Sequence, residues 1–242
     1  MKLLRCRRSF STSASLGKEI AKNLKGKSTS SQGWIQRQLR DPYVEKARQE
    51  NYRCRSAYKL LEIDEKFKIL KPGQCVVDIG AAPGSWTQVA VKRTNADEKI
   101  PGKPRGFVVA LDRLNIFPID GAALVTCDFT RPDAEKRLVD LLNGRPVDVV
   151  LSDMAPNATG VKSMDHDRIV ALALKAFKFG LQISAEGATV LMKLWEGRSC
   201  KAVETELSKF YDVVRWIKPK SSRSDSTETF ILGRGFKKSN VV

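Results

Sequence analysis

The chain contains a single histidine, His166, among 242 residues. A Ser-His-Asp triad or a histidine metal site would have to use it, and its neighbours Asp165 and Asp167 are typical of a loop or a helix start. The five cysteines are odd in number and include no C-x-x-C pair, which argues against a disulfide framework and against a cysteine zinc site. Cys75 and Cys127 lie in apolar runs, where cysteine usually acts as a small buried hydrophobic side chain. We therefore expect no metal.

Long hydrophobic runs are also missing. No segment approaches the roughly 20 consecutive apolar residues of a membrane-spanning helix, so an integral membrane protein is not expected. The hydrophobic content of 42% is ordinary for a soluble globular chain. The length suits one α/β domain with short extensions, and we expect a monomer.

Acidic residues are scarce at the N-terminus. Residues 1–40 hold ten Lys or Arg and one acid, Glu19, a net charge of +9 out of +16 for the whole chain. An Arg-, Lys- and Ser-rich segment that is nearly free of acids is typical of a mitochondrial transit peptide, which is the favoured interpretation. The alternative is a basic arm that binds nucleic-acid phosphates. A secretory signal is disfavoured because no apolar run follows the arginines.

Apolar runs of strand length alternate with helical patterns along the rest of the chain. Nearly continuous apolar strands are typical of a parallel sheet covered on both faces, so we predict a Rossmann-like, doubly wound α/β fold with seven mostly parallel strands. The last two strands are joined by the short polar segment 218–227, which predicts an antiparallel hairpin. The expected strands are Cys75–Ile79, Phe107–Leu111, Ala123–Cys127, Val147–Leu151, Thr189–Lys193, Val213–Ile217 and Phe230–Leu232. The expected helices are Ser85–Arg93, Pro132–Leu142, Asp165–Ser184 and Cys200–Phe210.

A glycine-rich turn follows the first strand, with glycines at 80 and 84. This G-x-x-x-G spacing differs from the G-x-G-x-x-G of dinucleotide folds, so a pyrophosphate cradle is less favoured. Asp112 ends the second strand, where an acid can bind ribose hydroxyls, and Asp128 ends the third, where it can accept an exocyclic amine. A structural turn with two surface acids is the alternative. The order of these features favours a nucleoside-type ligand, with Pro83 and Trp86 as walls of its pocket.

Four charged residues each lie within a distinctive local motif: Lys59, Asp153, Lys193 and Glu228. Most lysines and acids are surface residues, and that is the alternative for each of them. Lys193, however, follows the apolar run Val190–Met192, and Asp153 ends another apolar strand. Ligands bind at the carboxyl ends of strands in such sheets. Together with the glycine-rich turn, the two lysines and two acids predict an enzyme that removes a proton from a weakly acidic hydroxyl beside a bound cofactor.

The motifs resemble those of the FtsJ/RrmJ family of ribosomal RNA 2′-O-methyltransferases, in particular its mitochondrial branch, over residues 35–236. They are Ser56–Lys59, the turn Asp78–Trp86, the segment Ser152–Asn157, Lys193, and Glu228 with Thr229 and Phe230. The resemblance implies S-adenosylmethionine as cofactor and a catalytic tetrad at the four charged residues. Carried over by motif, the expected cofactor contacts are Gly80, Pro83, Gly84, Trp86, Asp112, Asp128 and Asp153. Ser85 departs from the family's frequent glycine, and the segment 95–105 reads as an insertion.

The chemistry that the resemblance implies is consistent with these residue types. Positioning the hydroxyl can lower the barrier by about 7–11 kcal/mol, whereas a general base contributes roughly 10²–10⁴-fold. We expect Lys193 to be the base, Asp153 to orient it beside the cofactor, and Glu228 to align Lys59 or the ribose. A second ammonium disfavours the charged form of a lysine and a carboxylate favours it, so the sequence leaves the balance open.

Basic residues interleaved with tyrosines precede Lys59 and suit contacts to an RNA backbone and its bases. A solvated helix face with inward-packing tyrosines is the alternative for each of them. More cations, including Lys218, stand just before Glu228 and could flank the other side of a cleft. The predicted RNA contacts are Arg37, Arg40, Arg53, Arg55, Lys220 and Arg223.

The family resemblance implies methylation of a nucleotide, expected to be uridine, in mitochondrial large-subunit ribosomal RNA. The organisation expected is a transit peptide with a flexible basic segment at 1–30, an RNA-facing extension at 31–55, a methyltransferase domain at 56–236 and a tail at 237–242. The expected location is the mitochondrial matrix, and the partner is ribosomal RNA or an assembling large subunit. The alternatives are another RNA, such as tRNA, or an RNA-binding assembly factor whose catalysis is dispensable.

Overall fold

The computed structural model describes residues 32–33, 35, 38–39, 41–156 and 159–240. It divides into two units, Met1–Glu45 and Lys46–Val242. Helix α2 (Pro42–Gln49) spans the division, and in the first unit Tyr43 N donates to Asp41 Oδ1 at the start of this helix. The predicted transit peptide lies outside the described residues.

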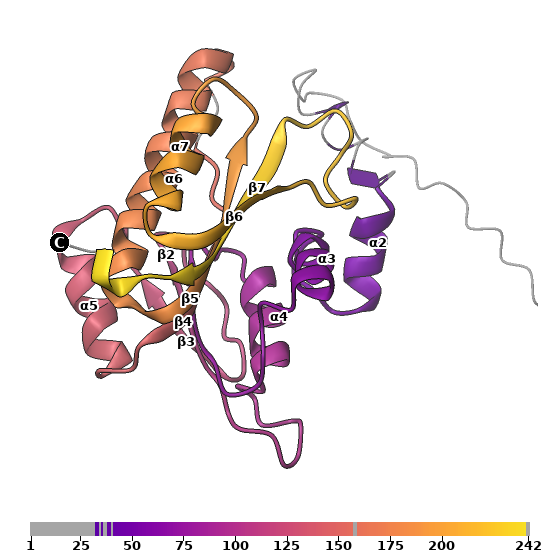
Figure 1. Ribbon diagram of the computed structural model, residues 1–242. Helices are drawn as coiled ribbons and strands as arrows, with labels where there is room; N and C mark the ends of the chain where they lie inside the picture. Colours follow the sequence, from indigo (N-terminus) through magenta and orange to yellow (C-terminus); the bar gives the residue numbers. More distant parts are fainter. Residues whose placement is uncertain (1–31, 34, 36–37, 40, 157–158, 241–242) are drawn as a thin grey trace, which may run out of the picture. The chain divides into compact units, whose positions relative to one another are not determined.

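The second unit is built on one seven-stranded sheet, as predicted (Figure 1). Its strands run in the order β3-β2-β1-β4-β5-β7-β6, and only β7 is antiparallel to its neighbours. The predicted antiparallel ending is confirmed, with β7 inserted between β5 and β6. The strands are β1 (Cys75–Ile79), β2 (Phe107–Asp112), β3 (Ala122–Thr126), β4 (Val147–Ser152), β5 (Ser184–Trp195), β6 (Tyr211–Ile217) and β7 (Glu228–Phe236).

Helices cover both faces of this sheet, as predicted (Figure 1). On one face lie α3 (Ala57–Phe67) and α4 (Ser85–Thr94), and on the other lie α5 (Pro132–Leu142), α6 (Lys162–Ile183) and α7 (Cys200–Ser208). A 3₁₀ helix, η1 (Lys238–Asn240), follows β7. No helix among the described residues is long and apolar enough to cross a membrane.

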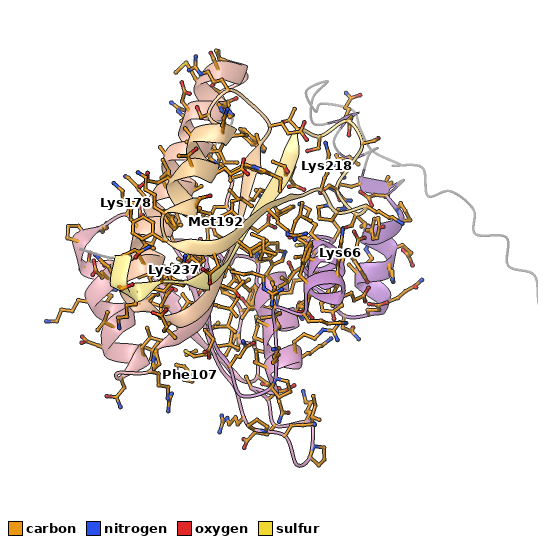
Figure 2. All side chains as sticks on the ribbon, viewed as in Figure 1. Lys66, Phe107, Lys178, Met192, Lys218 and Lys237 are labelled. Atoms are coloured by element: carbon orange, nitrogen blue, oxygen red, sulfur yellow. The ribbon has the colours of Figure 1, made fainter. Side chains whose placement is uncertain are left out.

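The core has two layers because alternate residues of each strand face opposite sides of the sheet. Met192 in β5 packs with Phe177 of α6, and Figure 2 shows it in the interior. Its neighbour Leu191 packs with Leu60 of α3 on the other side. Lys193 follows Leu191 by two positions, so it faces the α3 side.

The segment 95–105 forms a closed loop between α4 and β2. Asn95 Nδ2 donates to the carbonyl oxygens of Ile100 and Lys103, each at 3.1 Å, and Asn95 Oδ1 accepts from Ile100 N at 2.8 Å. One side chain therefore makes three hydrogen bonds that close this insertion. It leaves β1 and β2 in unbroken parallel register from Cys75 and Phe107 onward.

Candidate active site

The four charged residues singled out in the sequence come together on the α3 side of the sheet. In the β5–β7 ladder Lys193 is opposite Phe230, and Glu228 is opposite Trp195. Because residues two apart on a strand share a face, Lys193 and Glu228 point to the same side. Asp153 directly follows β4, the strand next to β5, and Lys59 projects from α3. Segments far apart in sequence thus converge at one end of the central strands.

Lys59 and Glu228 form a buried ion pair. Lys59 Nζ donates to Glu228 Oε2 at 2.6 Å, and the two side chains are only 10% and 11% exposed. The other carboxylate oxygen, Glu228 Oε1, accepts from Ser222 Oγ at 2.8 Å. Phe230 lies beneath the ammonium, with its ring centroid 5.8 Å from Lys59 Nζ. Both oxygens of this carboxylate are therefore held.

Lys193 and Asp153 form the second pair. Lys193 Nζ donates to the backbone carbonyl of Asp153 at 2.6 Å and lies 3.0 Å from Asp153 Oδ1. Burial alone would raise the pKa of Asp153, but the charges of Lys193 and Lys59 and a hydrogen bond from Ser56 outweigh it and lower the pKa. Asp153 is accordingly ionised at neutral pH and faces both ammonium groups.

Ser56 is a site residue whose role the sequence did not reveal. Its hydroxyl donates to Asp153 Oδ2, and its backbone carbonyl accepts from Trp86 Nε1 at 2.9 Å. The Trp86 ring lies against Phe230, with 5.7 Å between centroids. The glycine turn, the start of α3 and the tetrad are thus joined by one chain of contacts. The Ser56–Lys59 motif pointed to this segment, but not to the hydroxyl.

The segment between β6 and β7 is anchored on α3. Ser221 N donates to both carboxylate oxygens of Glu62, at 3.1 and 3.2 Å, and Arg55 donates to Ser221 O. Lys59 and Glu62 are spaced i and i+3 in α3, so they lie along one helix face, and Arg55 lies two residues before this helix begins. This face holds the loop that carries Ser222 next to Glu228, a role for Ser222 that no local motif indicated.

The glycine turn is shaped by contacts that exclude side chains. A Cβ atom on Gly80 would lie 1.9 Å from Met154 Cγ, and Gly80 has a φ of +75°. Gly84 has a φ of +106°, and its Cβ would lie 2.7 Å from Ile119 Cδ1. Both glycines are therefore required by close approach and by a positive φ.

A cavity of about 560 Å³ opens beside this turn. That volume is typical of small-molecule sites, which range over roughly 300–1,000 Å³. Four of the predicted cofactor contacts line it: Gly80, Asp112, Asp128 and Asp153. Lining residues that the sequence did not single out include Arg113, Leu114, Phe129, Met154 and Arg168. Acids at the ends of β2, β3 and β4 therefore share one cavity.

The acids in the cavity are pre-ordered by backbone and hydroxyl donors. Asp112 Oδ2 accepts from Ala82 N at 2.9 Å, and Asp112 Oδ1 accepts from Leu114 N at 2.8 Å. Asp128 Oδ1 accepts from the hydroxyl and the backbone N of Thr130, bonds that lower the pKa of Asp128. Each carboxylate keeps lone pairs for a ligand, since two oxygens offer about four acceptor sites.

Pro83, Gly84 and Trp86 do not line this cavity, contrary to the expectation that Pro83 and Trp86 wall it. Trp86 is 2% exposed and packs in the core on the α3 side. The residue at this position faces inward because α4 begins at Ser85 and lies on the sheet. The sequence marked the turn but not the direction of the ring.

The six predicted RNA contacts differ in their surroundings. Arg37 and Arg40 lie outside the described residues. Arg53 donates to the carbonyl oxygens of Pro83 and Pro118, and Arg55 donates to Ser221 O. Lys220 is exposed and Arg223 half-buried in the loop before Glu228. RNA contact by these residues stays a prediction.

The arrangement can hold an anionic or hydroxyl-bearing substrate between two ammonium groups beside a nucleoside-sized cavity. Asp153 belongs to both parts, because it pairs with Lys193 and also lines the cavity. Among the described residues, no group of three or more His, Cys, Asp or Glu side chains is arranged to hold a metal ion. The chemistry that these residues can supply themselves is proton transfer and orientation.

The sequence and the fold of this chain both match known RNA methyltransferases. A profile of the FtsJ-like methyltransferase family matches residues 52–236. The chain is 50% identical to "rRNA methyltransferase 2, mitochondrial" of Drosophila melanogaster over 221 residues, which is 91% of this chain and 88% of that protein. It is 46% identical to "Ribosomal RNA large subunit methyltransferase E" of Xanthobacter autotrophicus over 216 residues, 89% of this chain and 83% of that protein. A Plasmodium falciparum crystal structure described as a ribosomal RNA methyltransferase aligns with a TM-score of 0.68 and 28% identity, covering 76% of this chain and 98% of that one.

Proposed function

The chain belongs to the FtsJ-like methyltransferase family, and from this premise we propose that it transfers a methyl group from S-adenosylmethionine to a ribose 2′-OH of mitochondrial large-subunit ribosomal RNA. The observation that carries the proposal is the position of Asp153. It pairs with Lys193 and lines the cavity beside the glycine turn. A methyl donor and a hydroxyl acceptor would have to meet at such a residue.

The residues that line the cavity fit S-adenosylmethionine. The backbone near Gly80 lets a ligand approach closely, Asp112 offers acceptors for ribose hydroxyls, and Asp128 offers one for an exocyclic amine. Asp153 supplies negative charge for the cationic end. When bound there, S-adenosylmethionine supplies an electrophilic methyl group on sulfur. Gly80, Asp112, Asp128 and Asp153 are the residues that we propose hold it.

Lys193 is proposed as the general base. A neutral lysine amine has two N–H groups and one lone pair. The backbone carbonyl of Asp153 takes one N–H group at 2.6 Å. Asp153 Oδ1 lies 3.0 Å from Lys193 Nζ without a hydrogen bond of its own, near enough to take the other N–H group after a small rotation of the amine. The lone pair is then left for the ribose hydroxyl, whose proton passes to Lys193 Nζ as the oxygen is methylated. Asp153 orients the amine and stabilises the ammonium that forms.

Lys59 and Glu228 are proposed to position the ribose. Their pair is held by Ser222 and by packing on Phe230, so its geometry is set before substrate binds. Positioning of this kind is the larger catalytic term, since an oriented reaction gains about 7–11 kcal/mol.

The substrate class rests on the relatives and on the charge of this chain. Both relatives described above are named as ribosomal RNA methyltransferases, and the chain carries a net charge of +16. We propose Lys220 and Arg223 as phosphate contacts beside Glu228. The named mitochondrial relative and the basic first 30 residues support a mitochondrial, matrix location. Residues 56–236 are proposed as the catalytic domain, and 31–55 as an RNA-facing extension.

A direct test maps 2′-O-methyl groups on organelle ribosomal RNA from cells that lack the protein and from cells complemented with wild type or Lys193→Ala. Loss of one methylated site that only wild type restores is the expected result. An unchanged methylation map in cells lacking the protein would refute the proposal. Rescue of subunit assembly by Lys193→Ala would assign the chain a separate assembly role.

A further inference from the structure

Two loops form one wall of the cofactor cavity. One is the glycine turn after β1, which contributes Gly80 and Ala82, and the other is the segment 113–121 after β2, which contributes Arg113 and Leu114. On the cavity side Asp112 links them, because its carboxylate accepts from both Ala82 N and Leu114 N. The wall keeps its shape only while the two loops stay together.

Arg53 makes a second link between the same loops, away from the cavity lining. Its Nη1 donates to the carbonyl of Pro83 at 2.8 Å, and its Nη2 donates to the carbonyl of Pro118 at 2.7 Å. Its backbone is fixed as well, since Arg53 N donates to Gln88 Oε1 at 2.9 Å. Gln88 belongs to α4, so Arg53 is anchored to the helix that follows the glycine turn.

The glycine turn is fitted to this guanidinium. A Cβ atom on Gly84 would lie 2.8 Å from Arg53 Nη1 and 3.2 Å from Ile116 Cγ2. Gly84 does not line the cavity, so its close contacts are with the residues that bind the turn from outside. The absence of a side chain at 84 is what lets Arg53 and the segment 113–121 pack on the turn.

We propose that Arg53 is a positioning residue for the cofactor, one that holds the glycine turn and the 113–121 loop in the spacing that S-adenosylmethionine requires. The inference rests on the proposed function. A planar guanidinium can bridge two carbonyls with separate N–H groups at fixed geometry, whereas a lysine ammonium acts as a single point charge. If the two loops hold the geometry that binds S-adenosylmethionine for a smaller fraction of the time, the apparent affinity for S-adenosylmethionine falls in proportion.

A phosphate contact for Arg53 is the competing explanation, and it makes a different prediction. A phosphate contact depends mainly on charge, so Arg53→Lys would keep it, whereas a bridge between two carbonyls depends on the fork of donors. Arg53→Lys therefore separates the two roles. Arg215→Ala is a matched control, because Arg215 is an exposed arginine on the edge strand β6, at the opposite end of the sheet from β2 and β3.

The experiment measures the Kd of S-adenosylmethionine and of S-adenosylhomocysteine by calorimetry without RNA. Arg53→Ala and Arg53→Lys are both expected to bind about tenfold more weakly than wild type, the equivalent of one charged hydrogen bond, and Arg215→Ala is expected to bind as wild type does. Arg53→Lys with wild-type affinity would overturn the proposal, whatever happens to RNA binding.

Hydrogen exchange gives a second readout that does not need activity. In Arg53→Lys, amides of residues 80–86 and 113–121 are expected to exchange faster while those of β1, β4 and β5 keep their protection. Unchanged exchange in both loops would also overturn the proposal. Failure of the proposed function looks different: a wild-type protein that binds S-adenosylmethionine but methylates no RNA refutes that function and leaves the role of Arg53 intact.

Discussion

Lys59 and Glu228 are separated by 169 positions in the chain, yet Lys59 Nζ lies 2.6 Å from Glu228 Oε2 inside the protein. The pair joins α3 to the first residue of β7. It therefore ties the segment before the sheet to the last strand of the fold, and the same contact is part of the candidate catalytic site. Stability and function are expected to depend on it in separable ways.

Glu228→Ala is expected to destabilise the protein by about 3–5 kcal/mol, because it leaves the Lys59 ammonium buried without its partner. The double variant Lys59→Met/Glu228→Leu removes both charges and should recover most of that loss without recovering methyl transfer. Urea unfolding measures the first effect, and a methyl-transfer assay measures the second. A double variant that is as unstable as Glu228→Ala would contradict this account of the pair.

Asp78 predicts a pH dependence of stability. Burial and the nearby carboxylates Asp153 and Asp112 raise its pKa to about 7, against the opposing effect of a hydrogen bond from Thr87. Because the folded pKa is above the unfolded one, the stability that this group contributes is complete below about pH 4 and lost as the pH rises through 7. Replacing Asp78 with a residue that does not ionise should therefore stabilise the folded protein most at high pH.

Asp78→Asn is expected to raise the melting temperature at pH 8 and to have little effect near pH 4. The gain at high pH is at most about 4 kcal/mol, since one pKa unit corresponds to about 1.4 kcal/mol. Thermal unfolding of both proteins between pH 4 and 8.5 measures the difference. A difference that stays constant over this range would show that Asp78 does not titrate as inferred.

Ser56→Ala should impair catalysis with little change in cofactor affinity. The hydroxyl that donates to Asp153 Oδ2 is lost, so the pKa of Asp153 rises and the acidic limb of the pH–rate profile moves to higher pH. We expect roughly a tenfold fall in kcat, in line with about 1–3 kcal/mol for an unsatisfied buried acceptor. Ser56→Thr, which keeps a hydroxyl, is the control. Equal profiles for Ser56→Ala and wild type would remove Ser56 from the site.

RNA affinity is expected to fall steeply with salt, because phosphate binding releases counterions. Lys220→Ala and Arg223→Ala should each reduce the slope of log affinity against log salt by about 0.7–0.9. Lys178→Ala, on the outer side of α6, removes the same charge elsewhere and should leave the slope unchanged (Figure 2). A wild-type binding curve that is flat between low and physiological salt would remove the phosphate contacts from the account.

The sheet could be predicted from sequence because buried parallel strands are continuous apolar runs. The extensions of β5 and β7 could not. Ser184 to Gly187 and Gly233 to Gly235 have low strand propensity, and packing decides these positions. A Cβ atom on Gly233, for example, would lie 2.9 Å from the Tyr211 ring. Tertiary contact of this kind leaves no local pattern.

The charged residues of the site could be predicted because a lysine in an apolar strand and acids at strand ends are conspicuous. The residues that hold these charged groups and the neighbouring loops in place could not be predicted. The hydroxyl of Ser56 reaches a residue 97 positions away, and the guanidinium of Arg53 bridges backbone carbonyls that any residue could supply. The sequence likewise gave no indication that Trp86 packs in the core rather than on the cavity.

The proposed role of Lys193 as general base is to accept the proton of a ribose hydroxyl beside bound S-adenosylmethionine. Single-turnover methyl transfer to ribosomal RNA by purified wild type and Lys193→Ala, both saturated with cofactor and both shown to be folded, tests it most directly. Lys193→Ala is expected to bind the cofactor but to transfer methyl groups at least roughly 10²-fold more slowly. A Lys193→Ala protein that transfers methyl groups at the wild-type rate would contradict this role.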